Sequence, residues 1–365
     1  MVATLEKPVS GRRTSYAVID CDIHPNLKHP KALHPYMSER WRKHAELIGG
    51  RGHGGSYYPR ANPNAARWDS WPPNGLPPAS DLDFMRHQLL DTWSMDYGIF
   101  QPLLGAGGQA NLEYSQAMAD ATNEWQLAEW IDLEPRLRAG LVVPYEDGDL
   151  TAETIRRFGD NKGFVQLMLA IRTSEPLGRR KYWKMYETAC EYDLPVGIHF
   201  GGQGGGPITG AGWPSMYVED HAGMSAPFQS QVASYIFEGV FERFPTLKIV
   251  LIEGGFAWAP SLAWRMDQAY KKLHGEVPHL KKLPSEYFAE HFWFTTQPME
   301  EPENPNHFMH LIEQLPWLQD KLMFATDYPH WDFDAPDEAL PKIKLPEGFE
   351  PKVMAENARK LYKLA

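Results

Sequence analysis

The sequence is poor in cysteine and in long apolar runs. Its 365 residues include two cysteines, Cys21 and Cys190, which are too few for a disulfide framework, so we expect reduced thiols in the core. No apolar run approaches the roughly 20 residues that a membrane helix needs. Residues 1–15 also lack the apolar segment of a secretory signal. These absences predict a cytoplasmic protein with no membrane partner.

Basic charge is also scarce. Lys and Arg number 36 against 47 Asp and Glu, which gives a formal net charge of −11. A protein that binds nucleic acid needs a basic face, and the sequence offers none. The content of 43% hydrophobic and 23% charged residues is that of a globular protein. We therefore expect a single domain over 1–365 that acts on a small molecule, and these features leave a homodimer open.

Short apolar runs alternate with amphipathic stretches along the chain. The runs predict strands at 16–23, 97–102, 138–143, 163–169, 195–200, 248–252, 292–296 and 322–326. The stretches predict helices near 81–95, 111–131, 150–159, 180–193, 228–241, 258–273, 304–315 and 350–362. Eight strand–helix units favour one (β/α)₈ TIM barrel. The rival, a doubly wound open sheet, requires a glycine-rich fingerprint after the first strand, where this chain has Asp22, His24 and Pro25.

Two segments rich in glycine and proline interrupt this alternation, at 49–80 and 201–226. The first also contains Tyr57, Trp68 and Trp71, whose rings favour an ordered flap because they bury area at low entropic cost. Both segments follow predicted strands, on the side of a barrel where active sites are built. We expect 49–80 to cover the barrel mouth and these rings to line a pocket for a ring-bearing or otherwise apolar substrate.

The strongest local signal is the run Asp-Cys-Asp-Ile-His-Pro at 20–25. Alternation along a strand places Asp20, Asp22 and His24 on one face. Buried carboxylates are costly unless they are paired or bind a metal. Asp22 and His24 therefore indicate a divalent cation such as Zn²⁺, Mn²⁺ or Fe²⁺, although the run also fits a strand end with a capping Asp and a solvated His.

Three more predicted strands end in residues that can bind a metal. His199 ends the fifth predicted strand, Glu253 follows the sixth, and Asp327 and His330 follow the eighth. The carboxyl ends of barrel strands meet at one mouth, so we expect these side chains to converge there with those of the first strand.

These motifs resemble the amidohydrolase superfamily. An Asp-x-His at the first strand, a His at the fifth, Gly-Gly after the sixth and Thr-Asp-Tyr-Pro-His at the eighth are similar to its amidohydrolase-2 branch. That branch includes aminocarboxymuconate-semialdehyde decarboxylase and the resorcylate-type decarboxylases. The resemblance spans nearly the whole chain and implies the same barrel. It also implies that the metal ligands are Asp22, His24, His199 and Asp327.

The sequence departs from that family at two strands. Many members have a proton-transferring His where this chain has Glu253, and two-metal hydrolases of the superfamily carry a carboxylated Lys on strand four, where this chain offers Gln166. Glu253 is thus a general base, a ligand of a second ion, or a residue that orients a ligand His. We take Glu253, Asp327 and His330 as candidate catalytic residues and His221 as a candidate substrate contact.

Three functions remain open. The first is a metal-dependent enzyme that hydrolyses or decarboxylates a small organic acid or amide, aromatic or otherwise apolar in its body, with one or two divalent ions (Zn, Mn or Fe). The alternative is a non-haem oxygenase with two irons that uses O₂, favoured by Glu253 in place of His. The third is a barrel that only binds a ligand. Candidates to pair with a substrate carboxylate are Arg51, Arg60, Arg67, Arg172 and Arg265.

Overall fold

Eight parallel strands form a closed barrel in the computed structural model, which describes residues 16–47, 65–202, 204 and 206–365. The strands are β1 (Ile19–Ile23), β2 (Tyr97–Phe100), β3 (Leu137–Val142), β4 (Phe164–Ala170), β5 (Val196–His199), β6 (Ile249–Ile252), β7 (Phe292–Thr295) and β8 (Leu322–Met323). Each strand pairs with the next in chain order. The last closes on the first, because Cys21 N donates to Phe324 O at 2.9 Å and His24 N donates to Tyr328 O at 2.8 Å. The predicted (β/α)₈ barrel is confirmed.

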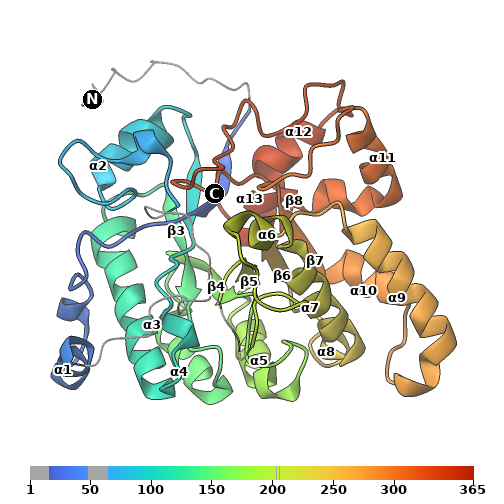
Figure 1. The fold of residues 1–365 in the computed structure, drawn as a ribbon, viewed down its shortest axis with the longest axis horizontal. Coiled ribbons are helices and arrows are strands. Elements are labelled where there is room, and N and C mark those ends of the chain that lie inside the picture. The colour runs from blue at the N-terminus through green and yellow to red at the C-terminus, as the bar shows by residue number, and fades with distance from the viewer. Residues whose placement is uncertain (1–15, 48–64, 203, 205) are drawn as a thin grey trace.

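Helices surround this barrel, with the blue and green α1, α3 and α4 on one side and the orange α9 and α10 on the other (Figure 1). The helices are α1 (Glu39–Leu47), α2 (Leu82–Met85), α3 (Leu112–Gln126), α4 (Gly148–Phe158), α5 (Trp183–Glu191), α6 (Tyr217–Ala222), α7 (Ser225–Phe237), α8 (Val240–Arg243), α9 (Ala259–Leu273), α10 (Pro284–His291), α11 (His307–Gln314), α12 (Phe349–Pro351) and α13 (Asn357–Tyr362). Turns of π-helix at Arg86–Asp91, Leu127–Ile131 and Lys352–Glu356 extend α2 and α3 and join α12 to α13.

The predicted helices differ from the observed ones in two respects. The helix expected over 228–241 is interrupted, because Gly239 takes a left-handed φ of 77° between α7 and α8. The sequence patterns also did not predict α1, α6 and α10. α1 has no fully buried residue, and with Trp41 as its partly buried contact with the core its apolar stripe is too short to signal a helix.

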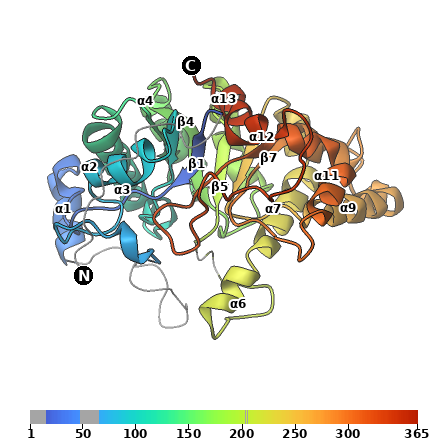
Figure 2. The same ribbon diagram turned by 90° about the horizontal axis from the view of Figure 1, so that it is seen from above.

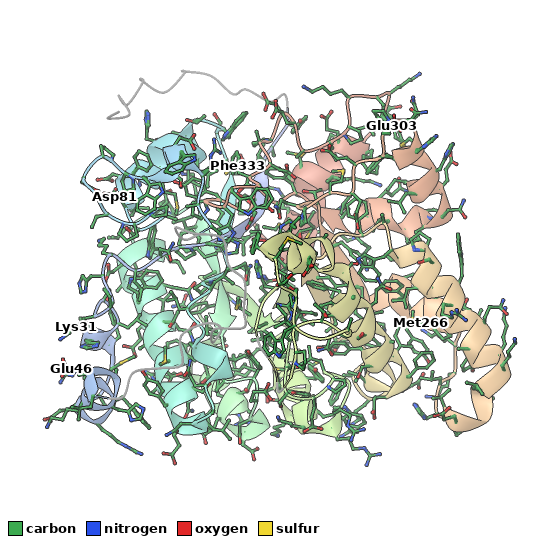
Figure 3. The ribbon with its side chains drawn as sticks, in the orientation of Figure 1. Lys31, Glu46, Asp81, Met266, Glu303 and Phe333 are labelled. Carbon is green, nitrogen blue, oxygen red and sulfur yellow. The ribbon has the colours of Figure 1, made fainter. Side chains whose placement is uncertain are left out.

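The described part of the predicted flap, 65–80, lies beside the loop that follows β8. Trp331 N donates to Ala65 O at 2.7 Å, and the Arg67 guanidinium lies 4.2 Å from the ring of Phe333, which Figure 3 labels. This pairing places 65–80 at the carboxyl end of the barrel. Tyr57 lies outside the described residues, so the covering of the mouth by 49–80 stays a prediction.

The two cysteines are free thiols, with Cys21 buried and Cys190 partly buried. Tyr362 on α13 donates from its hydroxyl to Gln166 Oε1 on β4 at 2.8 Å. Within the described ranges, no helix combines the length and the apolar character that crossing a membrane requires.

Candidate metal centre and active site

Four side chains from three strands meet at the carboxyl end of the barrel. Asp22 lies on β1, His24 follows it, His199 ends β5 and Asp327 follows β8. One ligand atom from each lies within 4.8 Å of the others. His24 Nε2 is 3.3 Å from Asp22 Oδ1 and 2.7 Å from Asp327 Oδ1, and His199 Nε2 is 3.4 Å from Asp22 Oδ2. The structure thus brings together all four residues that the resemblance implied as ligands, which we call the strand group.

The strand group fits a divalent cation. Its four side chains are at most 3% exposed. Both oxygens of Asp22, Asp327 Oδ2 and His199 Nε2 have no hydrogen-bond partner in the part of the chain that the structure describes. Buried polar atoms without partners are costly, and a cation among them would satisfy all of them at once. Imidazole nitrogens with carboxylate oxygens suit Zn²⁺, Mn²⁺ or Fe²⁺.

Backbone carbonyl groups orient the two histidines of the strand group. His24 Nδ1 donates to Gln101 O at 2.7 Å, and His199 Nδ1 donates to Phe200 O at 2.6 Å. A carbonyl oxygen only accepts, so each Nδ1 carries the proton and each Nε2 is left with a free lone pair. These contacts therefore turn the Nε2 atom of both rings toward the carboxylates, where it could bind a metal ion.

Asp20 joins β1 to the segment after β8. Its Oδ1 accepts from Asp22 N at 3.1 Å and from Thr326 N at 3.0 Å, and its Oδ2 accepts from Thr326 Oγ1 at 2.5 Å. Burial raises the pKa of Asp20 to about 7, although the hydrogen bonds from Thr326 oppose the shift. Asp20 thereby fixes the two backbone segments that carry Asp22 and Asp327.

Two acidic residues of the site have left-handed backbone. Glu253, directly after β6, has a φ of 57°, and Asp327 has a φ of 61°. Such conformations cost of order 1–3 kcal/mol for residues other than glycine and persist where the surroundings enforce them. Here Glu253 N donates to Thr295 Oγ1 at 3.0 Å, and Asp327 N donates to Asp22 O at 3.1 Å. The hydrogen bonds hold both carboxylates at the mouth.

His330 lies beside the strand group. Its Nδ1 is 2.7 Å from Asp327 Oδ1, and its ring stacks on His24 at 4.5 Å between centroids. Burial lowers the pKa of His330 well below its usual value, and the neighbouring His24 adds to this shift. Burial also raises the pKa of Asp327 well above its usual value, with Glu253 as the next cause. The structure therefore places the predicted catalytic residues Asp327 and His330 in direct contact.

Protonation differs between the two histidines of the strand group. Burial lowers the pKa of His24 to about 4. Burial also disfavours the charged form of His199, but the carboxylates of Asp22 and Glu253 outweigh it and raise the pKa of His199 to about 9. His199 Nε2 lies 3.1 Å from Glu253 Oε2. A proton and a metal ion would compete for this nitrogen, so a metal ion that bound at His199 would release a proton.

Three residues from loops and a short helix form a further cluster, which we call the loop group. Its members are His221 on α6, Glu253, and Asp332 after β8, with one ligand atom from each within 4.8 Å of the others. Sequence reasoning singled out His221 and Glu253 but missed Asp332. The available signal was its position two residues after the Thr-Asp-Tyr-Pro-His motif that follows the eighth strand.

Aromatic side chains lie around this mouth, but not all where we expected them. Trp331 packs against His221 at 5.2 Å between ring centroids. Trp68 is 86% exposed and Trp71 is partly buried. Tyr57 lies outside the described residues. Contact of Trp68, Trp71 or Tyr57 with a substrate therefore stays a prediction.

Of the predicted arginines, Arg172 is buried next to the site. Its Nη2 donates to Asp220 Oδ1 at 2.7 Å and its Nε donates to Ile208 O at 3.1 Å, while its guanidinium lies 4.6 Å from the ring of Phe200. Its Nη1 has no hydrogen-bond partner among the described residues. Among the other candidates, Arg67 forms an ion pair with Asp69, and Arg265 lies on α9. Arg51 and Arg60 lie outside the described residues.

The chain belongs to the amidohydrolase family, whose model matches residues 19–364. Among its relatives is the gamma-resorcylate decarboxylase of Polaromonas sp. strain JS666. The two sequences are 26% identical over 322 residues, which cover 80% of this chain and 93% of the relative.

Solved structures share the fold. The dihydroxybenzoic acid decarboxylase of Polaromonas sp. JS666, with bound manganese and 2-nitroresorcinol, aligns with a TM-score of 0.67 and 20% identity over 96% of this chain and 97% of that chain. The 5-carboxyvanillate decarboxylase of Novosphingobium aromaticivorans, with manganese and 4-hydroxy-3-methoxy-5-nitrobenzoic acid, aligns with a TM-score of 0.71 and 18% identity over 98% and 99% of the two chains.

These comparisons confirm the predicted branch of the amidohydrolase superfamily and an enzyme as the class of protein. They set aside the barrel that only binds a ligand. They give no support to the di-iron oxygenase alternative.

Proposed function

We propose that this chain is a decarboxylase that requires a divalent metal ion and releases CO₂ from an aromatic acid with a hydroxyl group next to the carboxylate. The observation that carries the proposal is the buried strand group, which contains carboxylate oxygens and an imidazole nitrogen that have no hydrogen-bond partner among the described residues. The chain that contains this group aligns with 93% of a resorcylate decarboxylase. Two structural neighbours contain manganese with nitro analogues of phenolic acids, which supports Mn²⁺ as the metal and a phenolic acid as the substrate class.

Decarboxylation requires stabilised negative charge and one proton. The bond between the ring carbon and the carboxylate breaks, its electron pair stays on the ring carbon, and that carbon takes up a proton as CO₂ leaves. A bound divalent ion supplies a positive centre for the substrate oxygens. Asp22, His24 and His199 would hold that ion, with Asp327 as the fourth ligand.

The contact between Asp327 and His330 provides the proton route in this proposal. A proton shared between Asp327 Oδ1 and His330 Nδ1, 2.7 Å apart, lies at the mouth where the ring carbon would stand. His330 is partly exposed, so it can exchange its proton with solvent after each turnover.

The test is turnover of a defined panel. Protein loaded with Mn²⁺ is incubated with 2,6-dihydroxybenzoate, 5-carboxyvanillate and benzoate, and the arene and CO₂ are quantified. We expect release from at least one phenolic acid, incorporation of one deuterium at the vacated carbon in D₂O, and no release from benzoate. Asp327→Asn should abolish release, whereas Asp334→Asn, the same change in the same loop, should retain it. Metal-loaded protein that converts no phenolic acid would refute the proposal.

A further inference from the structure

We propose that the loop group, His221, Glu253 and Asp332, binds a second divalent cation beside the one held by the strand group. His221 Nε2 lies 2.9 Å from Asp332 Oδ2, and one ligand atom from each of the three residues lies within 4.8 Å of the others. One imidazole and two carboxylates are a donor set that suits Mn²⁺, Zn²⁺ or Fe²⁺. This inference goes beyond the proposed function and does not depend on which reaction the enzyme performs.

The two groups touch at Glu253. Glu253 Oε2 of the loop group is 3.1 Å from His199 Nε2 of the strand group. Carboxylates at such positions bridge neighbouring ions in two-metal sites, where the ions are about 3.5–4 Å apart. Glu253 is therefore placed to contact both cations.

The charge of the site favours two ions over one. Asp22 and Asp327 of the strand group and Glu253 and Asp332 of the loop group carry four negative charges when all are ionised. One divalent cation leaves two of these charges uncompensated, and two cations balance them. Uncompensated buried charge is costly, so a second cation would stabilise the ionised site. The neighbouring Arg172 is already paired with Asp220 at 2.7 Å and adds no net charge.

Neighbouring side chains hold the loop group in position. Gln297 Nε2 donates to both Asp332 Oδ2 at 2.9 Å and Asp332 O at 3.1 Å. The His221 ring packs against Trp331, and the left-handed backbone of Glu253 turns its side chain toward the strand group. Ligands oriented in this way by outer contacts are typical of metal sites.

This arrangement differs from a pair of metals bridged by a carboxylated lysine on strand four. On β4 this chain has Gln166 in place of that lysine, and Gln166 Oε1 accepts a hydrogen bond from the hydroxyl of Tyr362. The second cation proposed here would instead be held by residues that follow β5, β6 and β8.

Metal stoichiometry tests the proposal without a substrate. Metal-free protein is titrated with Mn²⁺, passed over a desalting column, and its metal is counted by mass spectrometry. We expect two equivalents in the wild type and in the control Asp334→Asn, but one equivalent in Asp332→Asn and in Glu253→Gln. Electron paramagnetic resonance should show a spin-coupled pair in the wild type and the six-line signal of isolated Mn²⁺ in the two variants.

Three outcomes would overturn the proposal: one equivalent in the wild type, two equivalents in both variants, or loss of both ions from folded Asp332→Asn protein. Circular dichroism establishes that the variants are folded, and His221→Asn replaces any variant that is not. The metal count needs no substrate, so it is independent of the decarboxylation assay. A protein that binds two ions but releases no CO₂ in that assay contradicts the proposed function alone. A protein with one ion that releases CO₂ contradicts the second cation alone.

Discussion

The strand group and the loop group lie side by side but are built differently. The strand group comes from the ends of β1, β5 and β8, which are fixed by backbone hydrogen bonds around the barrel. In the loop group, the side chains of His221 and Asp332 are 16% and 13% exposed, and α6 projects from one rim of the molecule (Figure 2). The first site is therefore set by the fold, and the second depends on a few side-chain contacts that sequence change can alter.

The largest effect should follow from the strand group. Asp22→Asn removes the charge of a carboxylate whose two buried oxygens have no hydrogen-bond partner among the described residues. We expect metal affinity to fall by more than the roughly 10–100-fold that changes in outer contacts cost, and turnover to be lost. Metal analysis and product assays check this, with the exposed Asp160→Asn as control. Full metal content in Asp22→Asn would mean that Asp22 is not a ligand.

The contact between Arg172 and Asp220 should anchor the loop group. Arg172→Met removes the buried ion pair with Asp220 on α6, and breaking such a pair should cost about 3–5 kcal/mol of unfolding free energy. Denaturant unfolding measures the loss, and Arg172→Met with Asp220→Leu should recover part of it. The second equivalent of metal should weaken while the first persists. Equal weakening of both would remove the distinction between the two groups.

A smaller effect should follow from Gln297, whose amide orients Asp332. Gln297→Leu keeps a similar volume but removes the donor, so affinity for the second cation should fall about 10–100-fold. Affinity for the first cation should not change, because Gln297 makes no hydrogen bond to the strand group in the described structure. Calorimetric titration with Mn²⁺ separates the two steps.

The smallest effect, on the pH dependence of stability, concerns Glu134, a carboxylate that is neutralised by arginines of the protein and not by a metal ion. Glu134 accepts from Arg136 Nε at 2.8 Å and from Arg86 Nε at 2.9 Å, and the contact with Arg136 contributes most to lowering its pKa to about 2. Because the pKa is lower in the folded state, the ionised Glu134 stabilises the fold at a pH above its unfolded-state pKa of ~4.3. This contribution is lost as the pH falls toward 2.

Glu134→Gln removes this titration. On acidification, the free energy of unfolding of the variant should therefore fall by about 1–2 kcal/mol less than that of the wild type. Urea unfolding at pH 6, 4 and 3 measures the difference. Identical pH profiles for the two proteins would show that the arginines do not stabilise the ionised form. Unlike Glu134, the carboxylates of the two metal groups would find their counter-charge in bound cations.

The barrel and the strand group could be predicted because both leave periodic signals. Buried parallel strands are continuous apolar runs, and a polar residue that ends such a run stands out, as Asp22, His199 and Asp327 do. Strand order then brings these ends to one mouth without further information. The position of Glu253 was predictable in the same way, but its contacts were not.

The loop group could be predicted only in part, because loops have no period. Asp332 follows a turn whose path depends on pairing with Ala65 and Arg67, residues far away in the sequence. α6 is a short helix in a glycine-rich segment, so nothing in its composition predicted it. Contacts such as that of Gln297 with Asp332 arise from the packing of separate loops, and no local pattern encodes them.

The left-handed backbone of Glu253 and Asp327 also has a consequence for protein engineering. Glycine adopts this conformation without a steric penalty, so glycine at either position relieves strain. A library selected for heat resistance alone would therefore enrich glycine at 253 and 327 and would discard the metal chemistry as it raised the melting temperature. Thermostabilisation of this enzyme should keep these two codons constant and seek its gains on the outer helices.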